Sequence, residues 1–232
     1  MSNFEGIKHI FFDLDHTLWD FDRNSKMAYA QIFKEEKIEL DLEEFIKVYE
    51  PLNLIFWRRF RESEITKEQL RYQRLKESFD ACDFHVADDH INKMAEMYLD
   101  YLPNHNHLFP NCIELLDELK ERFELHIITN GFDEVQERKM HNSGLKPYFK
   151  YVLTAETAGV KKPDQAIFVK ALNDTGATYD NSLMIGDSLE ADIMGARKAG
   201  LRTIWFNTDV DADYQNELSV SDLMEIQSLL LP

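Results

Sequence analysis

Two aspartates near the start of the chain are the first residues that suggest chemistry. Asp13 and Asp15 directly follow an apolar run at 9–12 and stand in the segment Asp-Leu-Asp-His-Thr. If the run is a strand, both carboxylates leave its carboxyl end on one side, where a cation or a proton has to offset their mutual repulsion. The pair therefore predicts a cation site, although a solvated acidic turn has the same composition.

Two further segments could bind an anion such as phosphate. The segment Thr129–Phe132 reads Thr-Asn-Gly-Phe and follows a second apolar run. A hydroxyl and free backbone N–H groups at a helix start can hold an anion, but the same residues could be a plain helix N-cap. Lys162 precedes Pro163, which favours an extended lysine at a helix start. Its ammonium could point at a phosphate, or it could be an exposed loop lysine.

A second acidic pair completes the set. Asp187 follows Gly186 at the end of another apolar run, and Asp192 lies about one helical turn later. Helix capping by Asp187 is the alternative reading. Three converging carboxylates require a hard cation, and oxygen ligands favour Mg²⁺ as the cofactor. Taken together, the segments predict phosphoryl transfer to a carboxylate and then to water.

The elements that must position these residues can be read from the apolar pattern. Five short apolar runs are typical of buried strands, and helical periodicity separates the later ones. The alternation predicts an α/β fold with a doubly wound parallel sheet and helices on both faces. Ligands of such a sheet bind beyond the carboxyl ends of its strands, where all of these side chains lie. The runs cover residues 9–12, 125–128, 151–153, 183–185 and 203–206.

One long interval does not follow this alternation. Residues 20–107 contain several amphipathic helical patterns and no good strand, and they are too many for a simple crossover. We interpret them as an inserted all-helical domain, with a core domain made of residues 1–19 and 108–232. Pro51 lies inside one of the helical patterns, where it is expected to kink or divide the helix.

The charge balance limits the partners. The chain has 26 Lys and Arg against 43 Asp and Glu, a formal net charge of -17. So acidic a chain repels polyphosphate backbones and anionic lipid surfaces, and we expect neither nucleic acid nor membrane as a partner. A small phosphorylated metabolite stays compatible, because a bound metal can reverse the local field. Without a long apolar run or a signal-peptide pattern, the chain is expected to be cytoplasmic, and a monomer is expected.

The four segments together resemble the signature motifs of the haloacid dehalogenase-like (HAD) hydrolase superfamily, in the same order along the chain. The helical insertion resembles the C1-type cap of that family. The resemblance implies a Rossmann-like catalytic core and a Mg²⁺-dependent phosphatase that works through an aspartyl-phosphate. The matching residues are Asp13–Thr17, Thr129–Asn130, Lys162–Pro163, Gly186, Asp187 and Asp192.

The resemblance also implies a role for each residue. Asp13 would be the nucleophile, and Asp15 would be the general acid for the leaving group and then the base for water. The magnesium ligands would be Asp13, Asp187 and the backbone carbonyl of Asp15. Asp192 would orient a metal-bound water or the lysine. The phosphate oxygens would be bound by Thr129, Asn130, Gly131 and Lys162.

The second aspartate separates branches of the superfamily. Haloalkanoate dehalogenases are similar but lack it, so the presence of Asp15 favours phosphate chemistry. A broad-specificity sugar-phosphate or metabolite phosphatase stays open, and so does a phosphosugar mutase, because such enzymes keep both acids. A catalytically silent phosphate-binding module is the nonenzymatic alternative.

Two segments suggest the kind of phosphate. Phe12–Phe21 and Ile128–Phe132 resemble the YjjG-type pyrimidine 5′-nucleotidases, which implies a nucleoside 5′-monophosphate as substrate. Aromatic faces could stack a base, and arginine could bind its carbonyls or a phosphate. The same rings could instead pack the interior of the helical insertion. The candidate specificity residues are Trp19, Phe21, Trp57 and Arg58.

Overall fold

The computed structural model describes residues 4–208 and 217–231. The chain divides into two compact units, each of which is described by itself. The core unit consists of Met1–Asp20 and Asn106–Pro232, and the helical unit is Phe21–His105. Within the described ranges, no helix is both long and apolar enough to cross a membrane.

The core unit is built on a six-stranded parallel sheet with the order β3-β2-β1-β4-β5-β6. The predicted α/β fold and all five predicted strands are confirmed. The sixth strand was not predicted, because two residues offer no periodicity to read. The strands are β1 (His9–Phe12), β2 (Glu124–Thr129), β3 (Tyr151–Thr154), β4 (Ser182–Gly186), β5 (Arg202–Phe206) and β6 (Ser219–Val220).

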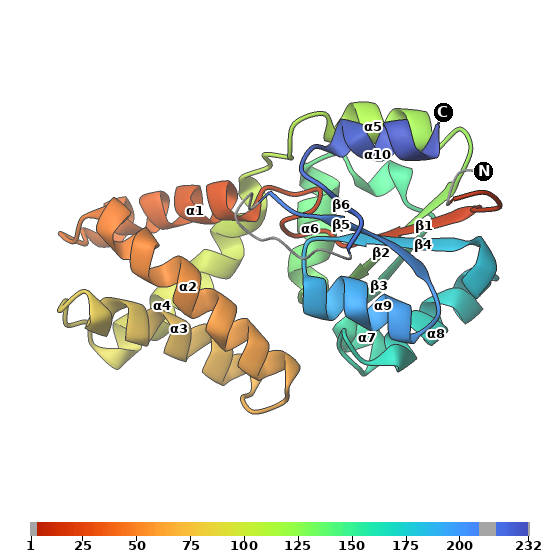
Figure 1. Cartoon of the computed structure of the whole chain (residues 1–232). Coiled ribbons are helices and arrows are strands. Elements are labelled where there is room, and N and C mark those ends of the chain that lie inside the picture. The colour runs from red at the N-terminus through yellow and green to blue at the C-terminus, as the bar shows by residue number, and fades with distance from the viewer. Residues whose placement is uncertain (1–3, 209–216, 232) are drawn as a thin grey trace. The chain divides into compact units, whose positions relative to one another are not determined.

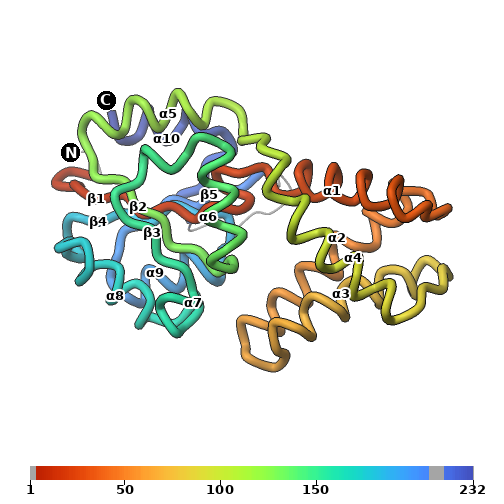
Figure 2. Tube along the Cα trace, turned by 180° about the vertical axis from the view of Figure 1, so that it is seen from behind, coloured from red at the N-terminus to blue at the C-terminus, as the bar shows by residue number. Residues whose placement is uncertain are grey.

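Helices cover both faces of this sheet (Figure 1). On one face lie α5 (Cys112–Leu119) and α10 (Leu223–Leu230), and on the other lie α8 (Gln165–Thr175) and α9 (Gly195–Lys198). The view from behind shows the same two layers (Figure 2). The sheet, α8 and α9 together form a buried apolar cluster. Its members include Phe11, Ile128, Leu153, Met184, Ile167 and Phe168.

Shorter elements complete the connections of the core unit. The helix α6 (Asp133–Asn142) links β2 to β3 and begins directly after the Thr-Asn-Gly-Phe segment. A π-helical turn, η4 (Leu189–Met194), follows β4. The other short helices are η2 (Lys146–Tyr148), α7 (Ala155–Ala158) and η3 (Tyr179–Asn181).

The helical unit is held together by aromatic side chains. Phe45 is fully buried, and its ring centroid lies 4.9–5.6 Å from those of four other rings, Tyr29, Phe33, Tyr49 and Phe79. Aromatic pairs at such distances contribute beyond the area that they bury. The helices of the unit are α1 (Phe21–Glu36), α2 (Leu42–Arg61), α3 (Lys67–Ala81) and α4 (Asp88–Tyr101), followed by the short η1 (Leu102–Asn104).

Pro51 does not divide its helix, contrary to one of the two expected outcomes. The helix α2 runs without a break from Leu42 to Arg61 and contains Pro51. A proline in a helix interior removes a hydrogen bond and costs about 3 kcal/mol. Buried side chains on both sides of Pro51, including Phe45 and Phe56, anchor the two halves in one packed face, which offsets this cost.

We expect Phe45→Ala to destabilise the helical unit by about 3–5 kcal/mol, because the truncation leaves a cavity among packed rings. Leu54→Ala is the matched control on the same helix, since Leu54 is 61% exposed and such changes usually alter stability by about 0.5 kcal/mol or less. Chemical denaturation followed by circular dichroism measures both. Equal losses of unfolding free energy in the two variants would contradict the place of Phe45 in the core.

Candidate active site

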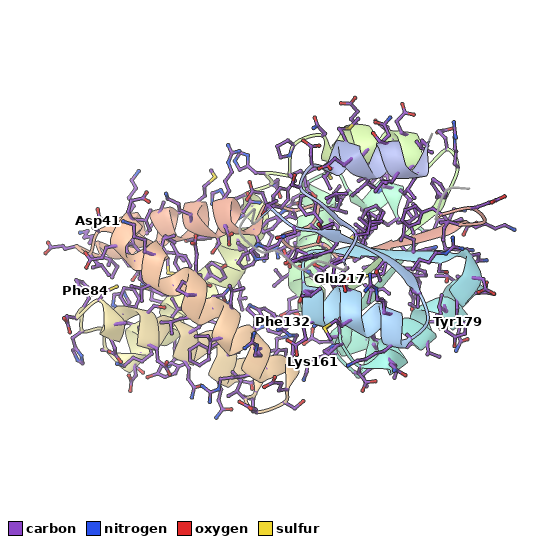
Figure 3. All side chains as sticks on the ribbon, viewed as in Figure 1. Asp41, Phe84, Phe132, Lys161, Tyr179 and Glu217 are labelled. Atoms are coloured by element: carbon purple, nitrogen blue, oxygen red, sulfur yellow. The ribbon has the colours of Figure 1, made fainter. Side chains whose placement is uncertain are left out.

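The sheet order brings the predicted site residues to one edge. Strand β1 lies between β2 and β4, so the carboxyl ends of these three strands are neighbours. Asp13 follows β1, and its backbone N–H donates to the carbonyl of Ile185 in β4 at 2.9 Å. Thr129 is the last residue of β2, and Asp187 follows β4. Figure 3 shows Phe132 and Lys161, which flank site segments, at the end of the core unit away from Tyr179.

Three carboxylates meet at this edge. Asp13, Asp187 and Asp192 offer oxygen atoms that all lie within 4.8 Å of one another. Asp13 is 7% exposed and Asp192 is 1% exposed. The ammonium of Lys162 lies between two of the acids, 2.5 Å from Asp13 Oδ1 and 2.7 Å from Asp192 Oδ1. It also donates to the carbonyl of Ile128 at 2.6 Å.

The charges of this cluster do not balance. Three carboxylates converge here, and the one ammonium contacts Asp13 and Asp192, which leaves a surplus of negative charge in the site. Burial raises the pKa of Asp13 well above its usual value, although Lys162 opposes the shift. Burial and then Asp192 raise the pKa of Asp187 to about 8. A divalent cation would remove this surplus, and an all-oxygen donor set suits a hard ion such as Mg²⁺.

Lys162 is held in place through its own backbone. The side chain of Asn130 accepts from the Lys162 N–H at 2.8 Å and donates to the Lys162 carbonyl at 3.0 Å. Although burial lowers the pKa of Lys162, the carboxylates of Asp13 and Asp192 raise it above its usual value. The lysine is therefore charged and its position is fixed. The alternative reading of Lys162 as an exposed loop lysine is wrong, because the side chain is buried.

Asp192 approaches the backbone at Gly186. A Cβ atom on Gly186 would lie 2.3 Å from the Asp192 carboxylate, so no larger residue fits there without a shift. Asp192 Oδ2 also accepts from the N–H of Ser188 at 3.0 Å. Beside it, the hydroxyl of Thr17 donates to Asp187 Oδ1 at 3.3 Å. The close contact with the Asp192 carboxylate therefore requires glycine at position 186.

Asp15 lies slightly apart from the three acids and contacts the helix α6. The ammonium of Lys139 is 2.6 Å from Asp15 Oδ1, and the amide of Gln136 donates to Asp15 Oδ2 at 3.0 Å. Both partners are buried. The same amide nitrogen of Gln136 donates to the hydroxyl of Thr129 at 2.7 Å, so Gln136 bridges Asp15 and Thr129.

Sequence reasoning missed Gln136 and Lys139. They lie three residues apart on α6 and therefore share a face of the helix. Two polar residues with this spacing, directly after the Thr-Asn-Gly-Phe segment, are the signal that could have revealed them. A surface helix carries many such pairs, so only the fold shows that this pair faces Asp15.

The candidate specificity residues differ in their surroundings. Trp19 is fully buried, and the Lys139 ammonium lies 4.3 Å from its ring centroid. The ring of Trp19 is therefore not exposed for stacking on a base. Phe21 is also buried, at the start of α1. Trp57 is half-buried against Phe60, with ring centroids 5.7 Å apart, and Arg58 is exposed on the same helix.

Comparison with known proteins gives the following relatives. Residues 7–200 match the model of the haloacid dehalogenase-like hydrolase family. The pyrimidine 5′-nucleotidase PynA of Streptococcus pneumoniae is 36% identical over 204 residues, 86% of this chain and 84% of that protein. The pyrimidine 5′-nucleotidase YjjG of Escherichia coli is 32% identical over 229 residues, 95% of this chain and 96% of that protein.

A solved structure agrees with these relatives. The putative HAD-hydrolase YfnB of Bacillus subtilis, bound to magnesium, superposes with a TM-score of 0.87 at 27% sequence identity. The match covers 97% of this chain and 99% of that one. The sheet, the site residues and the family match over most of the sequence lead to one conclusion. This chain belongs to the haloacid dehalogenase-like hydrolases.

Proposed function

We propose that this enzyme is a Mg²⁺-dependent phosphomonoesterase that transfers the phosphoryl group to Asp13 and then to water. The observation that carries the proposal is the convergence of Asp13, Asp187 and Asp192, with Lys162 in contact with Asp13 and Asp192. A magnesium ion, held by Asp13, Asp187 and the Asp15 carbonyl, would stabilise the charge of the transferring group. The magnesium in the related YfnB structure supports this ion.

Each residue of the chain contributes a specific part. Asp13 would attack phosphorus, and the charged Lys162 beside it would offset the negative charge of carboxylate and phosphate. Thr129 Oγ1 accepts from the Gly131 N–H at 3.1 Å and from Gln136 at 2.7 Å. Because those bonds occupy its lone pairs, the hydroxyl hydrogen of Thr129 is left to donate to a phosphate oxygen. The N–H group of Asn130 would bind the same anion, and that of Gly131 would first have to release Thr129 Oγ1.

Asp15 would move the protons. It would first donate a proton to the leaving oxygen, and the resulting carboxylate would then take a proton from the water that hydrolyses the aspartyl-phosphate. The two contacts from Lys139 and Gln136 hold both carboxylate oxygens and so orient the acid.

The substrate class follows from the relatives. Two proteins named pyrimidine 5′-nucleotidases are 36% and 32% identical over most of the chain. We infer that the substrate is a pyrimidine nucleoside 5′-monophosphate and that the helical unit is the cap, with Trp57 and Arg58 as candidates for contact with the substrate. The catalytic residues all belong to the core unit.

A substrate panel tests the proposal. Release of inorganic phosphate in the presence of Mg²⁺ is expected to give the highest kcat/KM for pyrimidine nucleoside 5′-monophosphates. Higher kcat/KM for sugar phosphates would indicate a broad metabolite phosphatase. Migration of phosphate without net release would indicate a mutase, and inactivity with every divalent metal would indicate a silent binding module.

In the same assay, the turnover of Asp13→Asn is expected to fall to the background rate, because the substitution removes the nucleophile. Asp117→Asn, the same change at an exposed site on α5, is the control and should leave turnover unchanged.

The role of Asp15 predicts different losses for different leaving groups. With 4-nitrophenyl phosphate, Asp15→Asn should release about one nitrophenolate per enzyme in a burst, because an aryl oxide departs without much protonation. Turnover should then be slow, reduced roughly 10²–10⁴-fold, because no base activates the water. With a nucleotide no burst is expected, since the alkoxide needs a proton. Stopped-flow absorbance and chemical quench measure these phases, and a variant that slows both substrates alike without a burst would contradict the role.

A further inference from the structure

A second group of metal-ligating side chains lies at the amino ends of the strands. His9 is the first residue of β1 and pairs in register with Glu124, the first residue of β2. His126 follows two residues later, so the side chains of Glu124 and His126 point to the same face of the sheet. The residue that pairs in register with His126 is Phe11, which belongs to the apolar cluster formed with α8 and α9. This edge of the sheet is opposite to the edge that carries Asp13.

The ligand atoms have the spacing of a metal site. His9 Nδ1 lies 3.1 Å from His126 Nε2 and 3.8 Å from Glu124 Oε2, and ligand atoms from all three residues lie within 4.8 Å of one another. In a tetrahedral zinc site with bonds of about 2.0–2.1 Å, neighbouring ligand atoms are about 3.3 Å apart. The separations of 3.1 Å and 3.8 Å lie on either side of this value, so a small adjustment of the Glu124 side chain would complete the geometry.

The two imidazoles are suited to bind a metal. His126 is 1% exposed, and its ring centroid lies 4.8 Å from that of Phe11, which restricts the orientation of the ring. Burial lowers the pKa of both histidines, that of His126 to about 4. Both rings are therefore neutral at pH 7, which is the form that ligates metals. His126 Nε2 faces His9 Nδ1, so a metal bound at Nε2 would leave the ring proton on Nδ1, which has no hydrogen-bond partner within residues 4–208 and 217–231.

Charges around the cluster permit a cation but weaken its binding. The Glu124 side chain is 45% exposed and gives an ion access from solvent. Its other oxygen, Oε1, pairs with the ammonium of Lys150 at 2.9 Å. Lys150 and Lys8 both lower the pKa of His9, which places their positive charge near the cluster. Lys150 therefore competes with a metal for Glu124.

We propose that His9, Glu124 and His126 form a transition-metal site for which Zn²⁺ is the best-matched ion, with water as the fourth ligand. Two imidazoles and one carboxylate with an open position are a ligand set that zinc uses, whereas Mg²⁺ prefers oxygen ligands. The site fastens the first residues of β1 and β2 to each other. It shares no residue with the carboxylate cluster, which lies beyond the carboxyl ends of β1 and β4.

Cobalt(II) as a spectroscopic probe tests the proposal on the full chain saturated with Mg²⁺, which fills the oxygen site. We expect one cobalt ion per chain to give the intense visible bands of four-coordinate cobalt, and stoichiometric Zn²⁺ to abolish them. Glu124→Gln and His9→Gln should each weaken cobalt binding at least about tenfold. Lys150→Gln should strengthen it, because the competing ammonium is removed. Circular dichroism confirms that the variants fold.

A control at the other edge of the sheet separates the two sites. Asp187→Asn should leave the four-coordinate cobalt spectrum unchanged, since that residue belongs to the carboxylate cluster. The proposal is overturned if Asp187→Asn abolishes the spectrum, if Glu124→Gln and His9→Gln bind cobalt as the wild type does, or if no four-coordinate spectrum appears. In the last case the contact between His9 and His126 is a hydrogen bond between neutral rings and nothing more.

Discussion

The burial of several carboxylates around a single ammonium is the constraint on which the rest of this structure depends. Asp13 and Asp192 are nearly inaccessible to solvent, and Lys162 is the one cation in direct contact with both, within the described part of the chain. Uncompensated charges at such burial would cost several kcal/mol, so the site has to acquire protons or a cation. A divalent ion would remove this surplus of charge, as the proposed phosphoryl transfer to Asp13 requires.

Much of this arrangement could be predicted because it is encoded locally. An apolar run followed by an acid, a hydroxyl or a lysine reveals a strand end with a functional side chain, and parallel strands place such ends at one edge. Asp13, Thr129 and Asp187 were found in this way, without knowledge of the strand order. The order β3-β2-β1-β4 then explains why segments separated by more than a hundred residues meet.

The remaining features depend on tertiary contacts that no local pattern encodes. Gln136 and Lys139 resemble any polar pair on a helix until α6 is placed beside Asp15. The clamp of the Asn130 side chain on the backbone of Lys162 joins positions 32 residues apart. Trp19 was an attractive candidate for stacking on a base because it is aromatic and follows the first motif. Its burial under Lys139 could be learned only from the packing.

The proposal depends most on a divalent cation bound by Asp13, Asp187 and the Asp15 carbonyl. Isothermal titration of Mg²⁺ into the metal-free enzyme tests it most directly, with Asp187→Asn as the variant and Glu190→Gln, an exposed acid of the same segment, as the control. The account predicts one magnesium ion per chain, with affinity lost in Asp187→Asn and unchanged in Glu190→Gln. Wild-type affinity in Asp187→Asn, or the absence of a magnesium ion bound to the wild type, would contradict it.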